Sequence, residues 1–200
     1  MLKKFGVIPV VTLAREADAV PVLGALQRGG LPVAEICFRT DCAAACIARG
    51  SEAFPDLCIG AGTVLDGAQC VRALEAGAQF IVSPGFSEEA AEVCAARKVF
   101  YLPGCATPTE IMRALAAGLT TLKFFPADVC GGLPAIRALS AAFPQVRFVP
   151  TGGVNERNLP EYLSFEKIDA VGGSWLAKGT PEEIEEKARR AVQIVREVRP

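Results

Sequence analysis

Short apolar segments alternate with longer amphipathic segments along this chain of 200 residues. The apolar segments resemble buried strands and begin at intervals of roughly 20–26 residues. The amphipathic segments have helical periodicity, and several are followed by a glycine, as helix C-termini commonly are. The expected strands are residues 7–11, 33–38, 57–61, 80–82, 100–102, 121–124, 147–149 and 168–171. The expected helices include residues 16–28, 43–49, 67–76, 88–97 and 108–117, and the glycines expected to end helices are Gly29, Gly50, Gly77 and Gly118.

Repeated strand–helix units predict an α/β protein with a parallel sheet. Eight units without a long insertion favour a closed (β/α)8 TIM barrel that forms a single compact domain over residues 1–200. The alternative is an open doubly wound sheet, in which one or two of the short strands are wrong. The last helix has a clear predicted start, because Thr180-Pro181-Glu182-Glu183 is a capping box with proline at the first helical position. In a barrel, functional residues are expected at the C-terminal ends of the strands.

Composition excludes several classes of function. The net charge is −1, so the chain lacks the basic surface that binds nucleic acid or an anionic membrane. No apolar stretch is long enough to span a bilayer, and no separate signal-peptide core precedes the first strand, so we expect a cytoplasmic protein. The eight cysteines contain no CxxC pair and are expected to be small apolar thiols. The chain has no histidine, which excludes Ser-His and Cys-His nucleophiles and His-ligated zinc.

A lysine lies within an apolar run, Leu122-Lys123-Phe124-Phe125-Pro126, where a strand is expected. Burying an ammonium group costs free energy unless the group is paired or neutralised. A neutral lysine amine is a nucleophile toward carbonyl groups, so Lys123 is a candidate catalytic residue. Side chains alternate along a strand, and this alternation directs Lys123 into the barrel while Leu122 and Phe124 face the helices. The alternative is a strand-end lysine whose ammonium reaches solvent.

The second expected strand also carries charged side chains. By the same alternation, Glu35, Cys37 and Arg39 share one face, with Arg39 nearer the C-terminal rim. Glu35 is either an acid–base group or the partner of a structural ion pair with Lys123. After the third strand, the glycines before Thr63 allow close approach of a ligand or simply form a tight turn.

Glycine pairs follow the last two expected strands, in Thr151-Gly152-Gly153 and in Gly172-Gly173-Ser174. Such pairs expose backbone N–H groups, which suits a phosphate. The loops after strands seven and eight form the phosphate site in many barrels, so we interpret these glycines as a phosphate-binding site.

Taken together, these motifs resemble the family of 2-keto-3-deoxy-6-phosphogluconate (KDPG) and 4-hydroxy-2-oxoglutarate (KHG) aldolases. The similarity extends from about residue 7 to about residue 176. The segments that carry it are Glu35-Ile36-Cys37-Phe38-Arg39-Thr40, Gly60-Ala61-Gly62-Thr63-Val64-Leu65, Ser83-Pro84-Gly85, Lys123-Phe124-Phe125-Pro126-Ala127, Pro150-Thr151-Gly152-Gly153 and Gly172-Gly173-Ser174-Trp175.

The resemblance implies a class I aldolase of the Entner–Doudoroff type, a lyase that uses no metal ion and no cofactor. Such an enzyme cleaves KDPG to pyruvate and glyceraldehyde 3-phosphate, with KHG, cleaved to pyruvate and glyoxylate, as an additional candidate substrate. On this resemblance Lys123 forms the Schiff base, Glu35 is the acid–base carboxylate, and Arg39 and Thr63 bind the pyruvate carboxylate. The phosphate would be bound by Thr151, Gly152, Gly153, Gly173 and Ser174. Family members are commonly trimers, so the resemblance also implies a homotrimer.

Other readings remain open at this point. The segment Gly104-Cys105-Ala106-Thr107-Pro108-Thr109-Glu110 is more similar to the related 6-phosphogalactonate aldolases, whereas Arg39 and the run from Lys123 to Ala127 favour the gluconate type. A sugar-phosphate epimerase or isomerase on the same barrel would use the phosphate loops without a Schiff base. A non-catalytic sugar-phosphate binding protein and a divalent-metal pyruvate aldolase are further alternatives.

Overall fold

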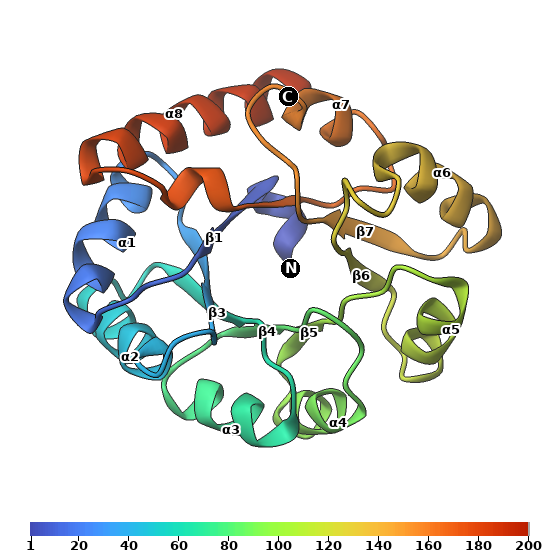
Figure 1. Cartoon of the computed structure of the whole chain (residues 1–200), viewed down its shortest axis with the longest axis horizontal. Helices are drawn as coiled ribbons and strands as arrows, with labels where there is room; N and C mark the ends of the chain where they lie inside the picture. The colour runs from blue at the N-terminus through green and yellow to red at the C-terminus, as the bar shows by residue number, and fades with distance from the viewer. Residues whose placement is uncertain (200) are drawn as a thin grey trace.

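The computed structural model of the chain describes residues 1–199. Eight parallel strands alternate with eight α-helices, and the helices surround the strands (Figure 1). The strands are β1 (Val7–Val11), β2 (Val33–Cys37), β3 (Cys58–Gly62), β4 (Phe80–Val82), β5 (Phe100–Leu102), β6 (Thr121–Phe124), β7 (Arg147–Pro150) and β8 (Val171–Gly173). The α-helices are α1 (Ala19–Arg28), α2 (Ala43–Ala53), α3 (Gly67–Glu75), α4 (Glu88–Arg97), α5 (Pro108–Ala116), α6 (Gly132–Ala142), α7 (Leu159–Leu163) and α8 (Pro181–Val198). Three short 3₁₀ helices are η1 (Leu2–Phe5), η2 (Glu16–Asp18) and η3 (Ser174–Ala177).

The strands close into a ring. Strands β5, β4, β3, β2, β1 and β8 are hydrogen-bonded in that order, and β6 pairs with β7. Parallel bridges join the two groups, Gly104 to Lys123 on one side and Thr151 to Gly172 on the other. The predicted (β/α)8 barrel is therefore confirmed. The open doubly wound sheet is wrong, because such a sheet would leave two unpaired edges.

An apolar cluster fills part of the barrel interior. Its buried members come from the inner faces of five strands, from η1 and from Ala170, which directly precedes β8. Leu2 of η1 is 1% exposed and belongs to this cluster, and the N-terminus lies within the ring of strands in Figure 1. The N-terminal segment thus closes one end of the barrel, and the opposite end is left for the site. The members of this inner cluster are Leu2, Ile8, Val33, Phe80, Val82, Leu102, Val149 and Ala170.

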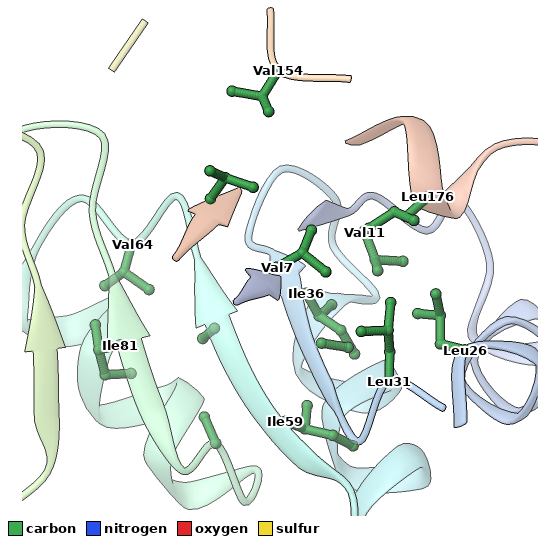
Figure 2. Packing of buried hydrophobic residues seen from close by; sticks show 14 of the residues in the cluster. Val7, Val11, Leu26, Leu31, Ile36, Ile59, Val64, Ile81, Val154 and Leu176 are labelled. Atoms are coloured by element: carbon green, nitrogen blue, oxygen red, sulfur yellow. The ribbon is translucent and has the colours of Figure 1, made fainter. Parts of the chain in front are cut away.

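A second and larger cluster lies between the strands and the helices. The outer faces of the strands contribute β-branched and aromatic side chains, and the helices contribute one apolar stripe each. Figure 2 shows part of this layer, including Ile36 of β2, Ile59 of β3 and Ile81 of β4. In β1, β2, β4, β5 and β7 the buried apolar residues are divided between the two clusters, so alternation defines which side chains of these strands point inward.

Two predicted boundaries differ from the structure by several residues. Helix α2 does not end at Gly50 but continues to Ala53, because Gly50 lies against Leu23 and Ile59, where a larger residue would clash. Strand β8 begins at Val171, and Ile168 forms only an isolated bridge with Phe148. The predicted capping box of α8 is confirmed by both of its hydrogen bonds. No helix within residues 1–199 is long and apolar enough to cross a membrane.

Candidate active site

Lys123 lies on the inner face of β6 and is 4% exposed. Its neighbours Leu122 and Phe124 are fully buried on the helix side, as strand alternation predicts. Two backbone hydrogen bonds, each of 2.8 Å, position Lys123: its N–H donates to the carbonyl of Pro103, and its carbonyl accepts from the N–H of Cys105. The amine is therefore held inside the barrel by strand pairing, not by a flexible loop.

Glu35 of β2 is the charged partner of Lys123. The ammonium donates a hydrogen bond of 3.3 Å from Nζ to Oε1 of Glu35, and the carboxylate residue is 2% exposed. Nζ also lies 5.2 Å from the centroid of the Phe125 ring, within cation–π range. Both charges are removed from water, so each depends on the other. Removal of one partner from such a pair typically costs about 3–5 kcal/mol.

Arg39 and Thr63 meet at the rim above this pair. Arg39 follows β2 and is exposed, and its Nε donates a hydrogen bond of 3.2 Å to Oγ1 of Thr63. Thr63 follows β3 with a φ of 57°, in the left-handed region that a β-branched residue rarely adopts. This conformation costs about 1–2 kcal/mol. Such strain is typical of functional sites.

Cys37 lies between Glu35 and the rim, on the same inner face of β2, and is fully buried. Burial raises the pKa of its thiol, and the charge of Glu35 acts in the same direction. Hydrogen bonds to the side chains of Thr63 and Thr12, and the charge of Arg39, act in the opposite direction. With its pKa raised, the group is a neutral thiol that contacts Thr63. The sequence placed Cys37 on this face and assigned it no role.

The loops after β7 and β8 lie side by side. Gly152 and Gly153 have φ values of 101° and 72°, which glycine adopts without strain. Thr151 is 7% exposed, and its side chain lies directly over Gly172 of β8, which has no room for a Cβ atom. The N–H of Thr151 donates to the carbonyl of Phe124, so this loop adjoins the strand that carries Lys123.

The second loop presents a hydroxyl group. Ser174 is exposed at the start of η3, directly after Gly173, whose Cα is covered by the Trp175 ring. Thr151 and Gly172 are bridged, so the two glycine-containing loops form one surface at the rim. Within residues 1–199, the turns and loops contain no backbone hydrogen bond donated by the N–H group of Gly152 or Gly153.

One contact in this region was not anticipated. Asp128, in the loop after β6, lies against Gly153, where a Cβ atom would come 2.5 Å from its Oδ2. The N–H of Asp128 also donates to the carbonyl of Gly152. The sequence contains no local signal for this contact, because the two residues come from different strand–helix units. A carboxylate thus borders the candidate anion site, and it repels bound negative charge.

The predicted residues therefore form two groups at one end of the barrel. Lys123 and Glu35 form a buried pair with Arg39 and Thr63 above them, and the two glycine-containing loops adjoin the next strands. No cluster of three or more His, Cys, Asp or Glu side chains that could hold a metal ion occurs in the part of the chain that the structure describes.

Comparison with known proteins identifies a family. Residues 1–193 match the family model described as "Aldolase: KDPG and KHG aldolase". The chain is 44% identical over 200 residues to the 2-dehydro-3-deoxy-phosphogluconate aldolase of Treponema pallidum, and the match covers 97% of this chain and 95% of that protein.

Solved structures agree with this match. The 2-keto-3-deoxy-6-phosphogluconate aldolase of Zymomonas mobilis superposes with a TM-score of 0.92 at 40% identity, covering 96% of this chain and 95% of that one. The KDPG aldolase of Legionella pneumophila superposes with a TM-score of 0.87 at 37% identity, covering 98% and 95%. In that structure pyruvate was captured at low pH as a covalent carbinolamine intermediate.

Proposed function

The chain belongs to the KDPG and KHG aldolase family, and we propose that it cleaves KDPG through a Schiff base on Lys123. The observation that carries this proposal is the buried pair of Lys123 and Glu35, with 3.3 Å between Nζ and Oε1. A nucleophile with an adjacent proton acceptor is the arrangement that covalent catalysis requires. The carbinolamine of the Legionella relative is the species that an amine forms with a ketone.

Imine formation uses both members of the pair. Glu35 takes a proton from the Lys123 ammonium, and the resulting amine attacks the C2 ketone of the substrate to form a carbinolamine. Glu35 returns its proton to the carbinolamine hydroxyl, which leaves as water. The products of this step are an iminium on Lys123 and an ionised Glu35.

Cleavage then uses the same carboxylate. Glu35 removes the proton of the C4 hydroxyl, the C3–C4 bond breaks, and the iminium accepts the electron pair as an enamine. The aldehyde leaves as glyceraldehyde 3-phosphate. Protonated Glu35 gives its proton to C3 of the enamine, and water hydrolyses the pyruvate iminium to restore the ammonium.

The substrate carboxylate is assigned to Arg39 and Thr63. A guanidinium and a hydroxyl donate hydrogen bonds of the kind that a carboxylate accepts, and ionic hydrogen bonds are the stronger class. The two groups are already 3.2 Å apart at the rim above Lys123. Little rearrangement is then needed when pyruvate binds, which lowers the entropy lost on binding.

The phosphate is assigned to the two glycine-containing loops. Backbone N–H groups at glycines with positive φ form concave anion sites, and hydroxyl groups add further donors. This assignment favours KDPG over KHG, which has no phosphate, and Asp128 beside Gly153 reduces the preference. The residues assigned to the phosphate are Thr151, Gly152, Gly153, Gly173 and Ser174.

The oligomer and the compartment are proposals of the same kind. We propose a homotrimer in the cytoplasm. Met112 on α5 and Val129 after β6 are large apolar residues, 62% and 79% exposed, as interface residues are in an isolated subunit. The eight cysteines are all free, as in a reducing compartment. Sedimentation equilibrium tests the trimer.

Steady-state cleavage assays test the function. Purified protein is given KDPG, its galactonate epimer and KHG in turn, and release of pyruvate is followed. We expect the highest kcat/KM for KDPG. Lys123→Arg should abolish release, and the matched control Lys98→Arg, at an exposed helix end, should leave it unchanged. Isomerisation of a phosphosugar without release of pyruvate would favour an isomerase. A higher kcat/KM for the galactonate compound would make this a galactonate aldolase.

A further inference from the structure

Gly60 and Gly62 of β3 both face the barrel interior, and each leaves space for a different neighbouring side chain. Neither has a positive φ, so the backbone does not require glycine at either position. A Cβ atom on Gly60 would overlap the ring of Phe80, which belongs to the inner apolar cluster. A Cβ atom on Gly62 would overlap the side chain of Glu35, with Cγ at 2.5 Å, Cδ at 2.6 Å and Oε1 closer still.

Strand register explains why Glu35 occupies this space. The Cα atom of Glu35 is level with Gly60, and Gly62 is level with Cys37, two residues nearer the rim. The Glu35 side chain therefore runs along β3 toward the rim before its carboxylate meets Lys123. It can follow this path only where β3 has no side chain on its inner face.

We infer that Gly62 is a positioning residue: its missing side chain creates the space that holds the Glu35 carboxylate against Lys123. This inference rests on the proposed acid–base role of Glu35. Gly62 itself touches neither substrate nor product in this account. It acts through the place that the carboxylate occupies.

The size of the effect follows from the overlap. Ordinary contact with a Cβ atom begins at 3.4 Å, so an alanine at position 62 displaces Cδ of Glu35 by about 1 Å. A displacement of about 1 Å is large compared with the narrow distance range of a hydrogen bond, so it disturbs the 3.3 Å contact between the Glu35 carboxylate and Nζ of Lys123. Misplacement of a catalytic group by about 1 Å reduces the rate by roughly 100-fold.

A double-mutant cycle tests the inference. The variants are Gly62→Ala, Glu35→Ala and the two combined, with kcat/KM for KDPG, exchange of the pyruvate methyl protons in D₂O, and urea unfolding measured for each. Gly62→Ala should lower kcat/KM and methyl exchange by roughly 100-fold in the parent protein. The Glu35→Ala variant lacks the overlapping atoms. In that background, Gly62→Ala should therefore change kcat/KM and the equilibrium constant of unfolding by less than about twofold.

Gly60→Ala is the matched control, since it adds the same atom on the same face of the same strand. It should destabilise the protein equally with and without Glu35, because its contact is Phe80. The inference is overturned if Gly62→Ala keeps parent activity, or if it reduces activity and stability as much in the Glu35→Ala background. It is also overturned if Gly62→Ala does not fold and the double variant does not recover the stability of Glu35→Ala.

The two proposals fail in different ways. If Glu35→Ala keeps full kcat/KM, the acid–base role of Glu35 is wrong. Urea unfolding of the same variants then still measures the contact between Glu35 and Gly62. If Glu35→Ala is inactive and urea unfolding shows no coupling between Glu35 and Gly62, the role of Gly62 alone is wrong.

Discussion

The strained conformation of Thr63 leads to a prediction in which stability and activity change independently. Thr63 has a φ of 57°, and Lys98 at the end of α4 has a φ of 55°, so glycine relieves a similar backbone strain at both positions. Relief of strain at a left-handed residue contributes about 1–2 kcal/mol, and the greater freedom of glycine in the unfolded chain removes about 0.5–1 kcal/mol. Lys98→Gly should therefore stabilise the protein by roughly 0.5–1 kcal/mol without changing its activity.

Thr63→Gly differs because it also removes a hydroxyl group. The hydrogen bond from Arg39 to Thr63 is exposed at the rim, so its loss removes about 0.5 kcal/mol of stability and leaves a net change near zero. A hydrogen bond to a charged carboxylate contributes about 1.5–3 kcal/mol, so KM for KDPG should rise by roughly 10- to 100-fold. Urea unfolding and initial-rate assays on both variants measure the two quantities. Destabilisation by more than about 1.5 kcal/mol in Thr63→Gly, or an unchanged KM, would refute the reasoning.

Two further predictions concern the rim and one of its helices. Gly153→Ala places a Cβ atom against Asp128 at a backbone φ of 72°. In initial-rate assays, KM should therefore rise roughly 10-fold or more for KDPG and change little for KHG. An equal rise in KM for both substrates would show that this loop does not bind the phosphate. Although partial burial acts to raise the pKa of Glu110, hydrogen bonds from Ala106 and Thr107 hold it below its ordinary value of 4.5. The folded state therefore favours the ionised carboxylate, and this stabilisation is present above pH 4.5 and lost as pH falls through the lowered pKa. Glu110→Gln should thus lower the melting temperature at pH 7 and have the melting temperature of the parent in acid, and a deficit that persists in acid would contradict this.

Much of the architecture could be predicted because strand periodicity is a local property. Strand starts at regular spacing are visible in the sequence, and alternation along β6 and β2 is sufficient to direct Lys123 and Glu35 inward. The helix end that was wrongly predicted at Gly50 has a non-local cause. Glycine has a low helix propensity, but close packing against Leu23 and Ile59 outweighs that preference inside α2.

The contacts that refine the site could not be predicted, because they join residues from separate strand–helix units. The overlap that Gly62 avoids depends on the register of β2 against β3, and no local pattern encodes that register. The approach of Asp128 to Gly153 likewise depends on how two loops meet at the rim. The left-handed conformation of Thr63 is also a tertiary effect, since local preference for a β-branched residue would predict an extended backbone.

The central claim is that Lys123 is the residue that bonds covalently to the substrate. The most direct measurement is to incubate the protein with pyruvate and borohydride, digest it and locate the reduced adduct by mass spectrometry. The account predicts that the reduced adduct lies on a single lysine, Lys123. An adduct on another lysine, or no adduct in protein that is folded and cleaves KDPG, would contradict it.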